Sequence, residues 1–193
     1  PMLKNYAKQY YQHVAAFPQY LSAVHYKMNN IEDRKLILEN LMDEESGSMN
    51  HLILWSDFAK ALGVKRKELL RAKPTSKTLA FVKHFKSATQ NGSVAEGIAA
   101  LYTYESQIPK VSKEKIIGLK KFYGVKTKAG LKYFTLHMKA DILHSKAERN
   151  LIAKYSTNKK IQSKVLKAVS STLDAYWNFL SGIQRSITYN FSK

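Results

Sequence analysis

The chain has 193 residues, 45% of them hydrophobic, which suits one globular domain with a sizeable core over residues 1–193. It contains no cysteine, so disulfides, cysteine-bound zinc and thiol nucleophiles are excluded. The formal net charge is +18, but the basic residues are spread along the chain without a nucleic-acid-binding motif, and a nucleic-acid partner is therefore not expected.

No apolar run approaches the ~18 residues of a membrane span, and the first residues show no basic-then-apolar signal pattern. We therefore expect a cytoplasmic protein without a membrane span. Glycine and proline are few, with eight and four residues, while tracts of alanine, leucine, lysine and isoleucine dominate. This composition predicts an all-α fold.

Helical periodicity and turn residues predict about seven helices in one domain. They cover residues 3–27, 31–45, 50–62, 75–89, 94–122, 131–153 and 159–187. Pro18 is expected to kink or split the first helix, and Pro109 to kink the fifth. The Ser-Gly-Ser segment at residues 46–48 is expected to loosen or break the chain before the third helix, and Gly63 to stop that helix.

The sixth predicted helix carries three polar residues on one face. His137, Asp141 and His144 are spaced by four and then three positions, so they lie over one another along roughly 10 Å of helix axis. The apolar residues that flank this face favour an inward orientation: Leu136, Ile142 and Leu143. Two imidazoles and a carboxylate inside a core need hydrogen-bond partners or a metal.

Acidic residues are scarce, so an acid within an apolar helix is a candidate for function. Glu44 (or its neighbour Glu45) precedes His51, and seven positions separate Glu44 from that histidine. Glu105 lies in an otherwise uncharged run, residues 100–108. Together with the set on the sixth helix, these residues supply three imidazoles and three carboxylates. A mixed set of this kind suits iron or manganese and also admits zinc.

Each part of this pattern also has a structural interpretation. The His-Asp-His set can be a hydrogen-bonded core network, and Glu105 can pair with one of the many lysines. Three further histidines lack acidic residues at a useful spacing and are interpreted as structural or surface groups: His13, His25 and His84. Most of the twelve tyrosines are assigned to packing, with Tyr104, beside Glu105, as the exception.

Several stretches resemble the heme-oxygenase-like diiron oxidase superfamily and, within it, the family of the Chlamydia protein associating with death domains. They are residues 6–11, 17–23, 40–45, 104–109 and 137–144. The resemblance runs from about Tyr6 to about Ala153. It implies a compact heme-oxygenase-like bundle in which six residues bind two metal ions: Glu44, His51, Glu105, His137, Asp141 and His144.

The same resemblance implies an oxidoreductase that uses two iron ions, or iron with manganese, and O2 as co-substrate in the synthesis of 4-aminobenzoate for folate. In that family a tyrosine of the protein itself is thought to supply the ring and a lysine the amino group. The lysine position matches Lys115. The tyrosine lies in an N-terminal helix that precedes Tyr6 and is absent from this sequence, so Tyr6, Tyr104 and Tyr133 are the candidates here.

Two other readings stay open at this point. The cofactor-free branch of the same fold is thiaminase-like or resembles the last enzyme of pyrroloquinoline quinone synthesis. Its thiaminase-like members use a cysteine, which this chain lacks. A protein that binds a death domain or another acidic surface is the second reading, since the basic charge favours such an encounter. The resemblance also leaves open a homodimer and secretion into a host.

Overall fold

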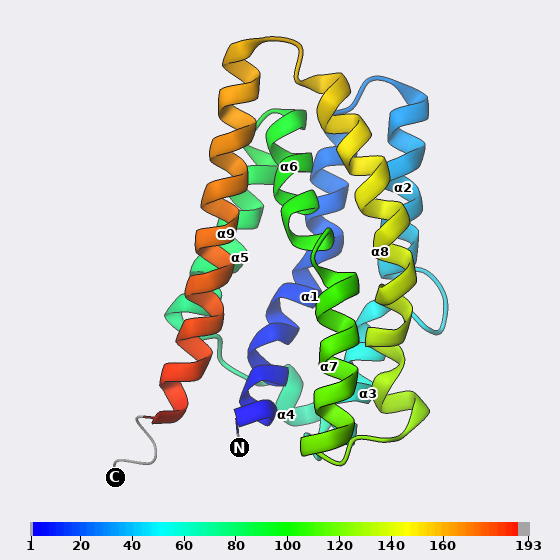
Figure 1. Cartoon of the computed structure of the whole chain (residues 1–193), viewed down its shortest axis with the longest axis vertical. Helices are drawn as coiled ribbons and strands as arrows, with labels where there is room; N and C mark the ends of the chain where they lie inside the picture. The colour runs from blue at the N-terminus through cyan, green and yellow to red at the C-terminus, as the bar shows by residue number, and fades with distance from the viewer. Residues whose placement is uncertain (1, 189–193) are drawn as a thin grey trace.

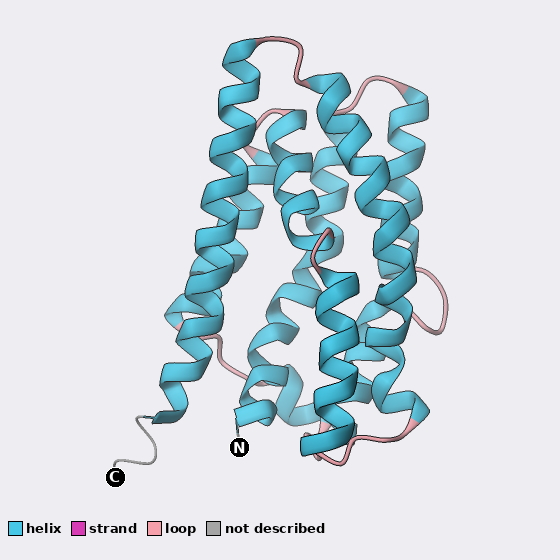
Figure 2. Cartoon of the chain, viewed as in Figure 1, coloured by secondary structure: helices cyan, strands magenta, loops and turns pink. Residues whose placement is uncertain are grey.

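The computed structural model describes residues 2–188, with side chains through residue 185, and all of its regular elements are helices (Figure 2). The nine helices of this part are α1 (Met2–Lys27), α2 (Ile31–Glu45), α3 (His51–Ala61), α4 (Arg66–Leu70), α5 (Ser76–Gln90), α6 (Val94–Glu105), α7 (Ile108–Phe122), α8 (Lys128–Tyr155) and α9 (Lys159–Thr188). The all-α prediction is confirmed.

Short polar side chains begin most of these helices. Asn30, Asn50, Thr75, Ser93 and Thr127 are the N-caps of α2, α3, α5, α6 and α8, and each side chain accepts a hydrogen bond from the amide three residues later. Such a bond satisfies one of the four amides that a helix start leaves without a partner. The predicted stop after α3 is also present, because Gly63 adopts a left-handed φ of 76°.

The two interior prolines behave differently from each other. The predicted single helix over residues 94–122 is wrong, because the chain leaves the helix after Glu105 and starts again at Ile108. The ring of Pro109 would clash with the carbonyl four residues earlier, which is that of Glu105. Pro18, in contrast, does not split α1. Its neighbours Phe17 and Tyr20 are buried against other helices, and this packing holds one continuous helix across the proline.

Nine helices occur in the described part instead of about seven, because residues 94–122 form two and because the basic segment after Gly63 forms α4. The backbone amide of Lys65 donates to the Glu68 carboxylate at the start of α4. In the part of the chain that the structure covers, none of the helices combines the length and the apolar character that crossing a membrane requires.

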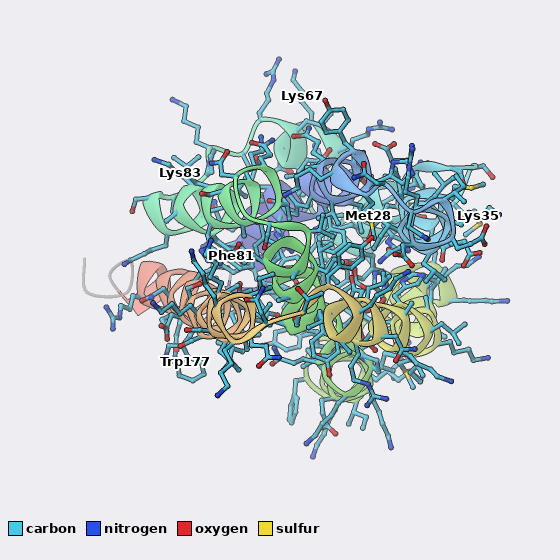
Figure 3. All side chains as sticks on the ribbon, turned by 90° about the horizontal axis from the view of Figure 1, so that it is seen from above. Met28, Lys35, Lys67, Phe81, Lys83 and Trp177 are labelled. Atoms are coloured by element: carbon cyan, nitrogen blue, oxygen red, sulfur yellow. The ribbon has the colours of Figure 1, made fainter. Side chains whose placement is uncertain are left out.

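α1 occupies the centre of the bundle and contacts α2, α3, α4, α5, α6 and α9 (Figure 1). α8 packs against α2, α3, α6 and α7 on one side of it. Seen from above, basic side chains such as Lys35, Lys67 and Lys83 project outward, while Met28 and Phe81 are buried (Figure 3). Much of the positive charge is therefore a solvated surface.

Candidate metal centre

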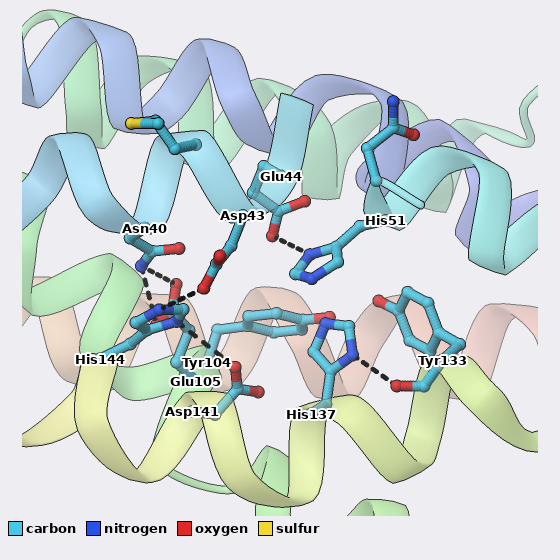
Figure 4. Close-up of polar contacts among 12 residues, drawn as sticks. Asn40, Asp43, Glu44, His51, Tyr104, Glu105, Tyr133, His137, Asp141 and His144 are labelled. Atoms are coloured by element: carbon cyan, nitrogen blue, oxygen red, sulfur yellow. Dashed lines mark hydrogen bonds and ion pairs between the residues drawn. The ribbon is translucent and has the colours of Figure 1, made fainter. Parts of the chain in front are cut away.

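The fold brings all six candidate ligand residues into two adjacent groups between α2, α3, α6 and α8 (Figure 4). Within each group, one ligand atom per residue lies within 4.8 Å of the others. The first group is Glu44, His51 and His137, and the second is Glu105, Asp141 and His144. Five of the six are buried and His144 is partly buried. The groups lie side by side, since Glu44, His137, Glu105 and Asp141 line one cavity.

Glu44 and His51 meet across a loop and not along one helix. α2 ends at Glu45 and α3 begins at His51, and Gly47 between them has a φ of 71°. The reversal places Nδ1 of His51 2.7 Å from Oε1 of Glu44. Burial alone would lower the pKa of His51, but the charge and hydrogen bond of Glu44 raise it. The loop between α2 and α3 is therefore what brings the pair together.

His137 has a defined tautomer. Its Nδ1 lies 2.7 Å from the backbone carbonyl oxygen of Tyr133, which can only accept, so Nδ1 carries the proton. Nε2 then has a free lone pair, the form in which imidazole binds a metal. Burial, with the charge of His51 second, holds the pKa of His137 well below its usual value. Its ring centroid is 4.3 Å from that of His51.

His144 lies among three carboxylates. Nδ1 is 3.7 Å from Oδ1 of Asp141 and 3.8 Å from Oε2 of Glu105, and Nε2 is 3.2 Å from Oδ2 of Asp43. Burial would lower the pKa of His144, but the hydrogen bond of Asp141 and the surrounding negative charges raise it to about 9. The surrounding carboxylates thus favour a positive charge at the position of His144.

Glu105 is held by a residue that the sequence reasoning missed. Nδ2 of Asn40, on α2, lies 3.0 and 3.1 Å from the two carboxylate oxygens and donates to them. Both side chains are 2% exposed. A signal was available, because Asn40 precedes Glu44 by one helical turn and therefore lies on the same face of α2. Asn40 fixes the orientation of a candidate ligand, as residues that surround metal ligands commonly do.

Glu148 is a second missed residue. It follows Asp141 by seven positions and His144 by four, which is the same spacing rule that identified the predicted set on α8. It is 1% exposed, and neither carboxyl oxygen has a hydrogen-bond partner among the described residues. Burial raises its pKa well above the usual value, and the charges of Glu105 and Asp141 raise it further.

The carboxyl groups of this cluster are poorly compensated. Burial and then the charge of Asp141 raise the pKa of Glu105 to about 8, while burial raises that of Asp141 to about 6. Oδ2 of Asp141 and Nε2 of His51 also have no partner in the described part of the chain. Unpaired buried acids are costly, and a divalent cation would pair them. The donor set therefore fits iron or manganese.

One argument for the inward orientation of this helix face is wrong. Ile142 and Leu143 are 56% and 70% exposed, so they do not mark a buried flank. His137 and Asp141 nevertheless point inward, at 4% and 3% exposure, because α8 packs that face against α2, α3 and α6. The spacing of the polar residues was the reliable signal.

The candidate tyrosines separate into two places. Tyr133 lies beside the six candidate ligand residues, here called the metal set, with its ring centroid 4.1 Å from that of His137. Tyr104 lines the same cavity as four of these candidate ligands. Tyr6, on α1, contacts Lys115 of α7, and 2.5 Å separates the Lys115 Nζ from the Tyr6 hydroxyl oxygen. Burial raises the pKa of all three phenols well above the usual value, so they are neutral.

Aromatic rings connect Lys115 with the metal set. Trp55 lies between Tyr10 and Tyr133, with 4.8 Å between centroids on each side, and Tyr10 is 5.1 Å from Tyr6. The sequence reasoning gave Trp55 no role and interpreted Tyr10 as a packing residue. Lys115 is partly exposed and lines an apolar pocket of about 280 Å³ with Leu3, Tyr6, Phe58 and Phe134. Burial lowers the pKa of its amine to about 8.

Several solved structures share this fold. A TenA homolog from Pseudomonas syringae pv. tomato gives a TM-score of 0.81 at 17% identity and covers 95% of this chain and 79% of its own. A CADD-like protein of unknown function from Nostoc punctiforme gives 0.79 at 16% identity, with coverages of 96% and 83%. A heme-oxygenase-like domain from Shewanella denitrificans gives 0.80 at 14% identity, covering 99% and 81%. The heme-oxygenase-like fold is confirmed.

Sequence relatives are more similar. The chain is 44% identical over 186 residues to the 4-aminobenzoate synthase of Chlamydia muridarum, covering 96% of this chain and 78% of that protein. It is 40% identical over 197 residues to the protein of the same name from Nitrosomonas europaea, with coverages of 97% and 80%. A family model described as an iron-containing redox enzyme matches residues 4–177. The chain therefore belongs to this family of iron-containing redox enzymes.

Proposed function

We propose that this protein is a 4-aminobenzoate synthase that uses O2 and two metal ions, both iron or iron with manganese. The observation that carries the proposal is the pair of three-residue ligand groups, one at Glu44, His51 and His137 and the other at Glu105, Asp141 and His144. The relatives that bear this name are up to 44% identical to the chain and support 4-aminobenzoate as the product.

In each ligand group, the geometry orients one residue for metal binding. An iron pair held by these residues would supply electrons for the reduction of O2. The neutral imidazole of His137 has Nε2 available to bind a metal, while its Nδ1–H donates a hydrogen bond to the Tyr133 carbonyl oxygen. Asn40 keeps both oxygens of Glu105 oriented, so the carboxylate is preorganised for a cation.

Lys115 is proposed as the amine donor. An amine is nucleophilic only when neutral, and burial brings the pKa of Lys115 down to about 8, so a useful neutral fraction exists near pH 7. Its Nζ lies 4.9 Å from the centroid of the Tyr6 ring and 5.2 Å from that of Tyr10. Tyr6, Tyr104 and Tyr133 are the proposed sources of the ring, with Tyr6 in direct contact with the amine.

A cofactor-free reaction on an anionic substrate suits this site less well. Burial raises the pKa values of Glu105, Asp141 and Glu148, so the site already disfavours negative charge, and another anion would be disfavoured in the same way. A partner-binding role does not account for two groups of buried ligands.

The test is single-turnover product formation by protein loaded with iron(II), alone or with manganese(II), and exposed to O2. Protein made with ¹⁵N-lysine is expected to release 4-aminobenzoate one mass unit heavier, at no more than one equivalent per chain. Lys115→Arg keeps the charge but removes the amine, so product should fall at least ~100-fold with metal content unchanged. Lys113→Arg, an exposed site on the same helix, is the matched control. Full product from Lys115→Arg would refute the role of the lysine.

His137→Ala separates the metal proposal from the lysine proposal. Because the variant loses one of the six proposed ligand residues, bound metal is expected to fall along with O2 consumption. Elemental analysis of protein purified without chelator or a nickel column measures the loss. A variant that retains wild-type metal and activity would exclude His137 as a ligand.

A further inference from the structure

His13, which the sequence reasoning set aside as structural or surface, is one of the most deeply buried polar residues of α1. It is fully buried, and neither ring nitrogen has a hydrogen-bond partner among the described residues. Buried polar side chains almost always have a partner, in protein or in ordered water. The imidazole therefore indicates a ligand that the protein chain itself does not provide.

The surroundings of His13 are almost entirely aromatic. Its ring centroid lies 4.6 Å from Phe81, 4.7 Å from Tyr104 and 4.9 Å from Phe85. A phenylalanine at this position would pack in the same cage without burying two unsatisfied nitrogens. Packing alone thus does not account for an imidazole here.

One side of the ring faces a small cavity. His13, Val14 and Phe17 of α1 line it together with four candidate ligands, namely Glu44, Glu105, His137 and Asp141. Its volume is about 10 Å³, which accommodates a single water-sized molecule. Of the three α1 residues that line this cavity, only His13 carries an unpaired hydrogen-bonding group.

We propose that His13 is a positioning residue that hydrogen-bonds one water-sized molecule in the cavity between α1 and the metal-binding residues. Water occupies the place at rest and a diatomic ligand such as O2 during turnover, and this second part rests on the proposed function. Burial lowers the pKa of His13 to about 3, so the ring is neutral, with one N–H to donate and one nitrogen to accept. It can hold a small polar ligand without adding charge.

The experiment uses nitric oxide, a diatomic molecule of the size of O2, added without air to the iron(II)-loaded protein. Electron paramagnetic resonance measures the iron–nitrosyl signal, and stopped-flow absorbance measures nitric oxide release. His13→Phe is expected to keep the wild-type iron content and thermal stability, because the ring still fills the aromatic cage. Release should become about fivefold to tenfold faster, as loss of one hydrogen bond predicts.

His13→Gln retains an N–H donor and should restore release to within about threefold of wild type. His84→Gln is the matched control, because His84 is a part-buried histidine of α5 whose side chain is hydrogen-bonded to Thr172 of α9. Wild-type release from His13→Phe would overturn the proposal. Loss of iron or of stability in both His13 variants would also overturn it, since the residue would then be structural.

A second measurement does not depend on the metal. A high-resolution crystal structure of the metal-free protein is expected to show one ordered water within hydrogen-bond distance of His13, and that of His13→Phe to lack it. A dry cavity in the wild-type protein would contradict the proposal. Failure of the wild-type protein to bind iron would instead count against the proposed function and leave this water test valid.

Discussion

Lys115 of α7 and Tyr6 of α1 are 109 positions apart, yet the lysine amine donates a hydrogen bond to the tyrosine hydroxyl over 2.5 Å. This contact joins the proposed amine donor to the first aromatic residue of the layer that leads through Tyr10 and Trp55 to the metal set. Because Lys115 is the proposed nucleophile, its protonation state should set the pH dependence of the reaction.

Product formation should rise with pH and level off above about pH 8. The amine is protonated and unreactive below its pKa, which burial lowers to about 8, and so the rate should fall about tenfold per unit well below that value. Single-turnover yields and rates from pH 6 to 9.5, at constant metal content, measure this. A rate independent of pH between 6 and 8 would contradict the assignment of Lys115.

Tyr6→Phe should move that midpoint to lower pH. The hydroxyl accepts a hydrogen bond from the ammonium form and stabilises it, so its removal favours the neutral amine by roughly 1 pKa unit. The same rate-against-pH measurement detects the shift. Complete loss of product, with bound metal and folding intact, would have a different meaning, because it would identify Tyr6 as the ring donor.

Asn40→Ala should weaken metal binding in the group that contains Glu105. The amide donates to both carboxylate oxygens at 3.0 and 3.1 Å, and loss of such an orienting bond typically costs about 10- to 100-fold in metal affinity. Manganese(II) titration followed by paramagnetic resonance gives the affinity of each site. Asn178→Ala, an exposed asparagine on α9, is the control. Equal metal affinities in wild type and Asn40→Ala would contradict the proposal that Asn40 orients Glu105 for metal binding.

Glu148→Gln should stabilise the metal-free protein, and more so as the pH rises. Burial raises the pKa of Glu148 well above its unfolded value, so the folded state holds a proton that the unfolded chain releases above about pH 4.5. The wild type therefore loses stability with rising pH, by up to about 1.4 kcal/mol per unit from this group, and the amide does not.

Urea unfolding of metal-free wild type and Glu148→Gln at pH 5, 6 and 7 tests this sign. The gap between them should widen from pH 5 to 7, whereas the exposed Glu39→Gln control on α2 should show none. A gap that narrows over this range would mean that Glu148 is stabilised as an anion.

Gly97→Ala should destabilise the fold by about 1–2 kcal/mol. A Cβ at this position would lie 2.8 Å from Cγ2 of Val24, which is itself fully buried where α6 crosses α1. Gly118→Ala on α7 meets nothing within 4 Å and should instead gain up to about 1 kcal/mol of helix propensity. Denaturant midpoints of both variants measure these changes in stability. Stability changes of the same sign in the two variants would contradict the packing argument.

Local sequence patterns determined the helical class, the helix caps and the polar face of α8. Residues three, four and seven apart share a helix face in any surroundings, so the common direction of His137, Asp141 and His144 followed from spacing alone. The same local rule would have found Glu148, which lies one turn further on. The resemblance to the heme-oxygenase-like diiron oxidases was also carried by residues in the sequence, and the match of the iron-containing redox enzyme family over residues 4–177 confirms it.

Only the tertiary structure decided how elements distant in sequence meet. The loop between α2 and α3 joins Glu44 to His51, and Asn40 reaches Glu105 from another helix. Pro18 stays within α1, while Pro109 follows a break, because burial around the first proline outweighs its intrinsic preference. Spacing along one helix fixes which way a side chain points. Whether it finds a partner there, as His13 does not among the described residues, depends on what the other helices place opposite it.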